Sequence, residues 1–227
     1  MMTRDAVLQG MLALFDRPRY LEIGVSHGVT FHNVTAKKKV AVDPDFHFDV
    51  EAARKQNPSA SYHAVTSDAY FGSIVDPDEQ FDVIYLDGLH TAEQTLRDLL
   101  NALVYLKPDG IIVIDDVKPS SHLASIPDRG TFAKVREFIG SRSKTWMGDV
   151  YKVIFFVDTF LQQLSWRTVA ENHGQAIVWR KRRPSITERL IPAVGSKSFE
   201  DLVLESSVLR VTPYQEIVEE IRSGRAR

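Results

Sequence analysis

The sequence predicts an α/β fold, namely a Rossmann-like, mostly parallel sheet of seven strands with helices on both faces. Three observations predict this class. Short apolar runs alternate with helix-like segments from residue 19 to about 115, which is the pattern of β-α-β units. Further strand-like runs follow the last of these units. A β-hairpin formed by these runs would make the last strand of the sheet antiparallel. The charged run RKRRP at 180–184 then marks the end of the domain.

The expected strands are short runs rich in apolar and β-branched residues. The clearest five are Tyr20–Ile23, Val40–Val42, Ser61–Ala64, Phe81–Leu86 and Gly110–Ile114. Two more are expected at Tyr151–Val157 and Gln175–Trp179, with a possible third near Leu164–Val169.

The segments between the strands favour helices, expected at Thr30–Ala36, Val50–Gln56, Ala69–Ile74 and Thr91–Leu106, with a further one at Thr131–Ile139. The fourth is the most regular. Thr91 and Gln94 have the spacing of a capping box. An apolar stripe with helical spacing follows, formed by Leu96, Leu99, Leu100 and Leu103.

Two segments differ from the alternating pattern. Residues 117–130 hold two prolines and three serines, which is typical of a loop. We place the domain at 1–182 and a C-terminal extension at 183–227, with a terminal helix that packs on the domain or forms a homodimer.

The composition excludes several classes of function. The net charge is −2, so the chain has no global field that would attract nucleic acid or an anionic membrane. The absence of cysteine excludes disulfides and thiolate chemistry and fits a reducing cytoplasm. No apolar run reaches the roughly 20 residues that cross a bilayer. We expect a cytoplasmic protein without nucleic-acid or membrane partners.

The segment YLEIGVSHG follows the pattern Glu-x-Gly-x-x-x-Gly and predicts a buried strand that enters a tight turn before a helix. Glycines in such a turn let the backbone approach a ligand closely. Polar residues also follow the second and third strands, where a nucleoside could bind. The expected cofactor-binding residues are Glu22, Gly24, Ser26, Gly28, Asp43, Ser67, Asp68 and Asp87.

Asp43 lies 21 positions after Glu22 and could accept hydrogen bonds from ribose hydroxyls, or it could be a turn residue before Pro44. Asp68 could accept from an adenine amino group, or cap a helix. A dinucleotide-binding oxidoreductase is the rival class. Its first glycine is replaced here by Glu22, which would repel a pyrophosphate.

A second group of acids follows the fourth and fifth strands. Asp115 and Asp116 come 28 and 29 positions after Asp87, and the two strands are expected to be neighbours. Three carboxylates at one point repel each other unless a proton or a cation separates them. Oxygen ligands suit Mg²⁺, with Mn²⁺ or Ca²⁺ as alternatives, so we expect a metal site there that lowers the pKa of an acceptor hydroxyl. The alternative is that Asp115 and Asp116 are ordinary carboxylates at a strand end. His90 is a candidate general base, although a polar residue before a helix would look the same.

The blocks YLEIGVSHG, VAVDP, FDVIYLDGLHTAEQTLRDL and LKPDGIIVIDDV resemble the class I S-adenosylmethionine (SAM) dependent methyltransferases, over roughly residues 15–182. The spacing of Asp87, Asp115 and Asp116 resembles the metal site of the catechol-type and antibiotic-sugar O-methyltransferases. The resemblance implies that these three acids are metal ligands and that Asp115 or Asp116 also touches the reacting hydroxyl.

We therefore expect methyl transfer from SAM to a hydroxyl of a small molecule, such as a sugar or natural-product scaffold, with Mg²⁺ and with Asp115 and His90 as catalytic residues. Two alternatives remain open. One is a metal-independent N-methyltransferase that depends on His90. The other is a non-catalytic SAM-binding partner subunit.

Overall fold

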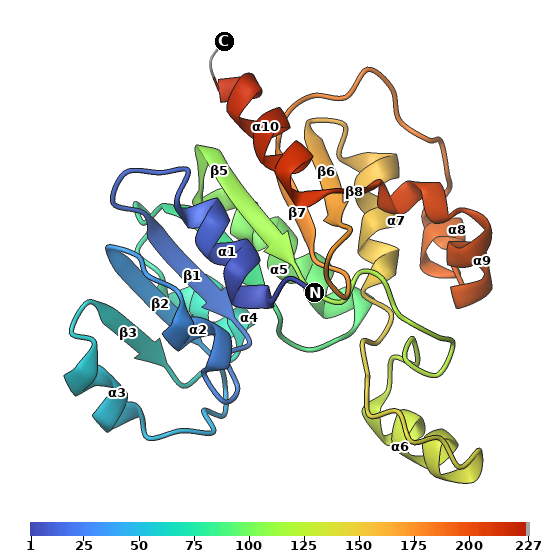
Figure 1. Cartoon of the computed structure of the whole chain (residues 1–227), viewed down its shortest axis with the longest axis horizontal. Coiled ribbons are helices and arrows are strands. Elements are labelled where there is room, and N and C mark those ends of the chain that lie inside the picture. The colour runs from blue at the N-terminus through green and yellow to red at the C-terminus, as the bar shows by residue number, and fades with distance from the viewer. Residues whose placement is uncertain (226–227) are drawn as a thin grey trace.

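Eight strands form one sheet in the computed structural model, which describes residues 1–225, and helices cover both faces (Figure 1). The strand order is β3-β2-β1-β4-β5-β7-β6-β8. In chain order the elements are α1 (Arg4–Leu12), β1 (Arg19–Ile23), α2 (Val29–Asn33), β2 (Lys38–Val42), α3 (Val50–Gln56), β3 (Ala60–His63), α4 (Ser67–Ala69), η1 (Tyr70–Ile74), β4 (Phe81–Leu86), α5 (Ala92–Tyr105), β5 (Leu106–Ile114), α6 (Arg129–Phe138), α7 (Tyr151–Phe160), β6 (Leu164–Val169), β7 (Ala176–Arg180), α8 (Ile191–Gly195), α9 (Phe199–Leu204), η2 (Ser206–Leu209), β8 (Val211–Thr212) and α10 (Tyr214–Arg225).

The predicted fold class is confirmed, with one correction to the strand count. The sheet has eight strands rather than seven, because the short β8 from the C-terminal part pairs in parallel with β6. The remaining pairs are parallel except those of β7, which runs antiparallel to both β5 and β6. The antiparallel strand is therefore the last strand before the C-terminal part, as predicted.

The expected strand at Tyr151–Val157 is wrong, because this segment forms helix α7. The run is apolar almost throughout, and a continuous apolar run does not distinguish a buried strand from a buried helix. Seven of the ten residues of α7 are buried against the sheet and its neighbouring helices. The sixth strand is instead Leu164–Val169, the segment that the sequence pattern offers as a possible additional strand.

Local polar contacts fix where the helices begin. The side chain of Asp49 accepts a hydrogen bond from the backbone at the start of α3, and Thr91 does the same for α5. Gln94 does not complete the expected capping box. Its amide donates to Ser67 Oγ at 3.1 Å and to Asp98 Oδ1 at 3.0 Å, and the first of these bonds ties α5 to α4.

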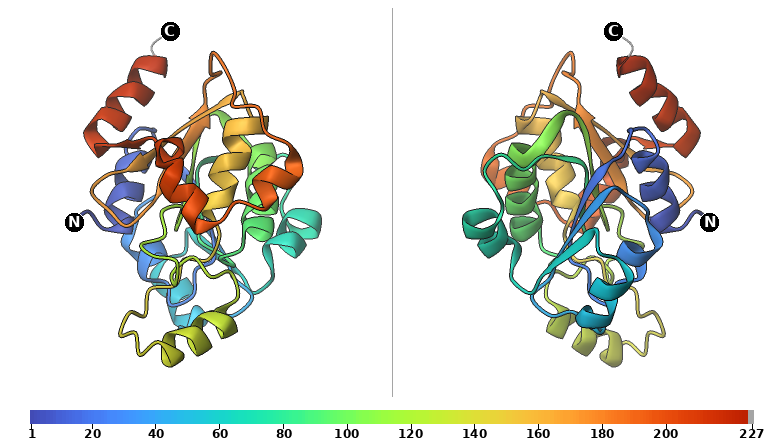
Figure 2. Two further views of the ribbon diagram at one scale, coloured as in Figure 1. Left: turned by 90° about the vertical axis from the view of Figure 1, so that its right-hand side faces the viewer. Right: turned by 90° about the vertical axis from the view of Figure 1, so that its left-hand side faces the viewer.

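Two hydrophobic cores lie on opposite faces of the sheet (Figure 2). One is formed with α5, α7, α8 and α9 and includes Trp166 and Phe155. The other is formed with α1, α2, α3 and α10 and includes Phe31 and Tyr20. Because side chains alternate along each strand, consecutive residues of β1 enter different cores.

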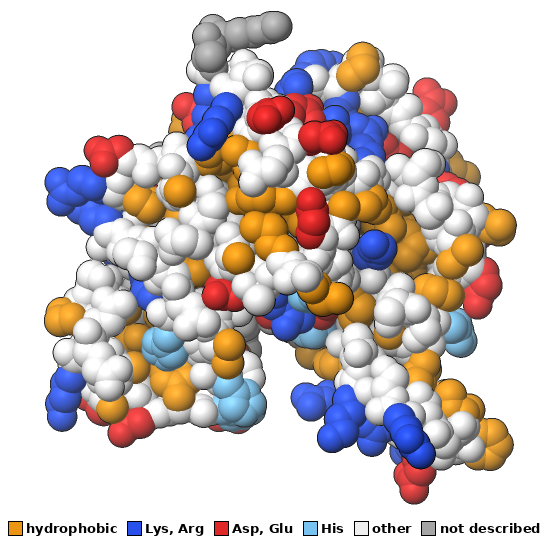
Figure 3. All heavy atoms as spheres, viewed as in Figure 1, with side chains coloured by type: hydrophobic (Ala, Val, Ile, Leu, Met, Phe, Trp, Pro, Cys, Tyr) orange, Lys and Arg blue, Asp and Glu red, His pale blue; other side chains and the backbone are white. Residues whose placement is uncertain are grey.

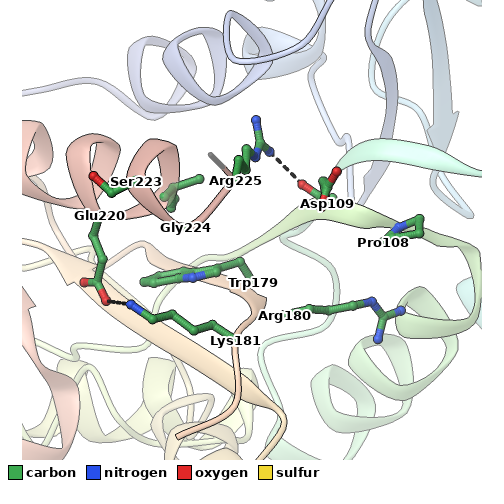
Figure 4. Close-up of a pocket in the computed structure, with 11 residues that line it drawn as sticks. Pro108, Asp109, Trp179, Arg180, Lys181, Glu220, Ser223, Gly224 and Arg225 are labelled. Carbon is green, nitrogen blue, oxygen red and sulfur yellow. Dashed lines mark hydrogen bonds and ion pairs between the residues drawn. The ribbon is translucent and has the colours of Figure 1, made fainter. Parts of the chain in front are cut away.

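The C-terminal part packs on both faces of the domain. Its helices α8 and α9 join the first core, whereas α10 joins the second core beside α1. A cavity of about 330 Å³ lies between α10, the end of β7 and the start of β5, and Figure 4 shows the residues that line it. There Lys181 pairs with Glu220 at 3.0 Å, and Arg225 donates to the backbone oxygen of Asp109.

Arg183 of the charged run is not a solvated edge residue. Its guanidinium is buried, pairs with Asp158 at 3.1 Å and donates to the backbone at the end of α7. The domain limit at 182 and the homodimer remain predictions. Among residues 1–225, no helix combines the length and the apolar character needed to cross a bilayer.

Candidate functional site

The parallel strands end at one level, where backbone hydrogen bonds connect each strand end to the next. The N–H of Asp43 donates to His63, that of Gly24 to Val42, that of Asp87 to Ile23, and that of Asp115 to Leu86. The strand order reverses direction between β1 and β4, so this edge is a switch point of the sheet. Ligands of open α/β sheets bind at such an edge.

A cleft of about 510 Å³ opens at this edge. Six of the eight residues that the sequence predicted for cofactor binding line it, together with His90: Gly24, Ser26, Asp43, Ser67, Asp68 and Asp87. Glu22 and Gly28 are not among the lining residues. The expected convergence on one cleft is thus present for most of the set.

The turn after β1 has the conformation that the glycine pattern suggests. Gly24 has a φ of +85°, and a Cβ there would lie 2.0 Å from the backbone oxygen of Asp87, so only glycine fits. Ser26 also has a positive φ, +48°. The Asp43 carboxylate holds this turn by accepting from the backbone N–H groups of Val25 and Ser26, both at 2.8 Å.

Glu22 points into the second hydrophobic core rather than into the cleft. It is 1% exposed and accepts a hydrogen bond from Tyr20 Oη at 2.6 Å. Burial raises the pKa of Glu22 to about 8, although Tyr20 and Lys39 oppose the shift. Gly28 begins α2 with a φ of +74°, and a Cβ there would collide with the His32 ring.

Asp115 and Asp116 lie beside Asp87, as the expected adjacency of β4 and β5 requires. Both are at most 3% exposed. Asp116 has a φ of +59°, which is unusual for a residue with a side chain and is common at functional sites. Burial and the other two carboxylates raise the pKa of Asp87 well above its usual range.

Three further side chains contact this acidic cluster, and one of them, Arg4, carries a compensating positive charge. Arg4 of α1 contacts Asp115 and lies 3.7 Å from Asp116. His173 Nε2 lies 3.2 Å from Asp115 Oδ1, and Tyr85 Oη donates to Asp115 Oδ2 at 2.8 Å. Burial alone would raise the pKa of Asp115, but the nearby His173 and Arg4 outweigh burial and lower it.

His90 lies on the other side of Asp116. Its Nδ1 is 2.9 Å from Asp116 Oδ2, and its Nε2 is 3.8 Å from Asp87 Oδ1. The imidazole stacks on the Trp146 ring, with centroids 4.7 Å apart and planes 4° from parallel. This stacking and the Asp116 carboxylate fix the orientation of the imidazole at the mouth of the cleft.

The cluster contains buried polar atoms that have no hydrogen-bond partner of good geometry within residues 1–225. They are His90 Nδ1, Asp115 Oδ1, Asp116 Oδ2 and His173 Nε2. These four atoms nevertheless face one another in two pairs, His90 Nδ1 with Asp116 Oδ2 at 2.9 Å and His173 Nε2 with Asp115 Oδ1 at 3.2 Å, so by themselves they do not require a further ligand.

Two sets of ligand atoms lie within 4.8 Å of one another, and neither equals the predicted trio of acids. One set is Asp87, His90 and Asp116, and the other is Asp115, Asp116 and His173. Arg4 already supplies a cation beside the second set. The first set borders a small cavity of about 10 Å³, which Asp115 also lines.

The part of the chain that carries this site matches a known family. Residues 21–117 match the family model described as the methyltransferase domain. The resemblance to the class I methyltransferases is therefore confirmed. This segment runs from β1 to the residue after Asp116, so it contains the turn, the three acids of the cluster and all the residues that line the cleft except Arg129 and Trp146. No match was found among curated proteins.

Solved structures share the fold at low sequence identity. The plantazolicin methyltransferase BpumL in complex with a desmethyl analogue and S-adenosylhomocysteine (SAH) has a TM-score of 0.51 at 11% identity, covering 78% of this chain and 83% of that one. A Staphylococcus aureus protein assigned as a caffeoyl-CoA O-methyltransferase has a TM-score of 0.50 at 11% identity, covering 80% and 85%. Both show the fold alone.

Sequence reasoning missed Arg4, Tyr85, Trp146 and His173. A signal existed for His173, because an antiparallel last strand starts at the edge where its parallel neighbours end. Residues just before Gln175–Trp179 should therefore have been searched for polar side chains. No such signal existed for Arg4, whose position depends on how α1 packs across the sheet.

Proposed function

We propose that this methyltransferase domain transfers a methyl group from SAM to a hydroxyl of a small molecule. The observation that supports this most is the position of the acidic cluster and His90 beside a glycine-walled cleft at the switch point. The acidic cluster with His90 can ionise an acceptor, and the cleft can hold a nucleoside. The product cofactor SAH is bound in the solved structures of BpumL, which has the same fold.

The cleft suits SAM in shape and in charge. Gly24 lets the turn pack against the backbone of Asp87, which brings two strand ends together at the cleft, and Asp43 and Asp68 line the cleft after the next two strands. A sulfonium and an ammonium group are both cationic, so a cleft lined by carboxylates attracts them. We assign the ribose to Asp43 and the adenine to Ser67 and Asp68 of α4.

A divalent ion fits the set formed by Asp87, His90 and Asp116. Two carboxylates and one imidazole are ordinary ligands of divalent ions, and the imidazole favours Mn²⁺ over Mg²⁺. Such an ion would lower the pKa of an acceptor hydroxyl. Arg4, His173 and Tyr85 hold Asp115 in this arrangement, so Asp115 acts as a positioning residue for the cluster.

A second candidate is methyl transfer without a metal, to oxygen or to nitrogen. The pairing of His90 Nδ1 with Asp116 Oδ2 favours it, because that contact orients the ring and leaves Nε2 to accept a proton. The acceptor then forms its bond to the methyl carbon as the carbon–sulfur bond breaks, and the acceptor proton passes to Nε2. SAH is the product in either version.

Calorimetry with SAM and SAH tests the cofactor, and binding of neither one would refute the proposal. EDTA treatment and Asp116→Asn test the cluster. Asparagine tolerates a positive φ, so the variant should fold, and we expect turnover to fall about 100-fold. Asp109→Asn is the matched control, because Asp109 lies at the opposite end of β5 and is exposed.

The pattern of losses separates the two versions. Loss of turnover in EDTA that added Mn²⁺ or Mg²⁺ restores supports the metal-assisted reaction. Turnover that is indifferent to EDTA but lost in His90→Gln supports the metal-free one. Full activity in Asp116→Asn after EDTA treatment contradicts both.

A further inference from the structure

A second cavity of about 510 Å³ adjoins the cleft and is built largely by α6. Three residues line both spaces, namely His90, Arg129 and Trp146. The two spaces therefore adjoin at these three side chains, one of which is the imidazole that the proposed function places at the reacting group. A molecule with its hydroxyl at His90 would extend into this second cavity.

One face of α6 forms a wall of the cavity. Arg129, Phe132, Ala133 and Arg136 line it, and their spacing of three, four and seven residues places them on one side of a helix. Lys144 and Trp146 line it from the chain that returns after the helix. Arg129 and Arg136 are seven residues apart, which corresponds to roughly 10 Å along the axis.

The cavity is lined by positive charge without acid. Arg129, Arg136 and Lys144 all face it, none of its lining residues is acidic, and none of the three forms an ion pair in the described chain, 1–225. The two arginines instead lie over aromatic rings, Arg129 over Trp146 at 5.7 Å and Arg136 over Phe132 at 6.0 Å. Figure 3 shows Lys and Arg side chains gathered on this protruding lobe.

The two adjoining spaces thus have opposite charge. The cofactor cleft is lined by the carboxylates of Asp43, Asp68, Asp87 and Asp98, whereas the α6 cavity is lined by cations alone among its charged residues. Unpaired cations that converge on a cavity attract an anionic group, and guanidinium groups bind phosphate and carboxylate with two hydrogen bonds.

We propose that the α6 cavity binds the acceptor through a phosphate or carboxylate group, at a part of the molecule remote from the hydroxyl to be methylated. Arg136 and Lys144 bind the anionic group, and Arg129 lies between it and the reacting end. This inference rests on the proposed function and adds the substrate class, an anionic small molecule. The phosphate and the carboxylate are two forms of one anionic chemistry, and the experiment separates them.

The test uses Arg136→Gln and Lys144→Gln, with Lys134→Gln as the matched control. Lys134 lies on the same helix, is exposed and carries the same charge, but it does not line the cavity. Calorimetric titrations with pyrophosphate and with citrate measure anion affinity. We expect each cavity variant to bind the preferred anion five- to tenfold more weakly than wild type, and Lys134→Gln to stay within twofold.

Turnover is measured with two matched pairs of acceptors. One pair is a sugar and its phosphate ester, and the other is a phenol and the same phenol carrying a carboxyl group. The wild type should prefer the charged member of one pair at least tenfold in kcat/KM, and both cavity variants should lose that preference while Lys134→Gln keeps it. The pair that shows the preference identifies phosphate or carboxylate.

Equal anion binding in all three variants, or no preference for either charged acceptor, would overturn the inference. SAM binding keeps the two proposals apart, because Arg136 and Lys144 do not line the cofactor cleft. Normal SAM binding with unchanged anion affinity refutes the anion site alone. Absence of SAM binding in the wild type refutes the proposed function, and the anion titrations still decide the charge of the cavity.

Discussion

Replacing Glu22 by glutamine should make the protein more stable at neutral and alkaline pH, because a buried carboxylate opposes folding when it is charged. Folding raises the pKa of Glu22 from 4.5 to about 8. A carboxyl group with a raised pKa favours the folded state when protonated. Its contribution is complete below the unfolded pKa and is lost as the pH rises through the folded one.

The magnitude follows from the slope of this loss, which is at most about 1.4 kcal/mol per pH unit. Between pH 5.5 and 7.5 the wild type should therefore lose up to about 3 kcal/mol relative to Glu22→Gln. Glutamine can still accept the hydrogen bond from Tyr20, so the variant keeps that contact. Other titrating groups are common to both proteins and cancel in the difference.

Urea unfolding at several pH values measures the effect. With a slope of about 2.5 kcal/mol per molar urea, the difference between the two midpoints should change by roughly 1 M from pH 5.5 to pH 7.5. Glu51→Gln is the control, because Glu51 is exposed and should change stability by less than about 0.5 kcal/mol at each pH. Parallel curves for wild type and Glu22→Gln would refute the reasoning.

Two further substitutions test the fold around the site. Gly24→Ala places a Cβ against the backbone of Asp87 at a positive φ. We expect this variant to lose SAM binding in calorimetry and at least about 2 kcal/mol of stability in thermal unfolding. Gly72→Ala is the control and should be nearly neutral in both measurements, because the space around Gly72 is open. Arg183→Ala leaves the buried carboxylate of Asp158 without one of its partners and should cost about 3 kcal/mol of stability in urea unfolding. The exposed Arg182 is the control, and Arg182→Ala should cost less than about 0.5 kcal/mol. Equal effects of the two substitutions would show that the burial of Arg183 is unimportant.

The carboxyl edge of the sheet was accessible from sequence because it follows from local rules. Each parallel strand is a short apolar run followed by a polar residue, and β-α-β alternation aligns the strand ends. The pattern alone therefore assigns Gly24, Asp43, Asp87 and Asp115 to one edge, and their backbone hydrogen bonds lie there.

Chain segments distant in sequence were not accessible in this way. Arg4 and His173 reach the acidic cluster from the first helix and from the turn before the antiparallel strand, more than fifty residues away from it. Periodicity also failed for the apolar run of α7, because a segment buried on all sides has no polar face to reveal its repeat.

The sequence by itself determined the α/β class, the positions of the first five strands along the chain and the acids at their ends, since these depend on patterns a few residues long. Only the tertiary structure decided which side chains contact those acids and on which side of the sheet Glu22 lies. It also decided that α6 places basic side chains without acidic partners in a cavity that His90 lines. The reason is physical: strand ends are placed by local alternation, whereas charge compensation and burial depend on packing between segments that no local pattern relates.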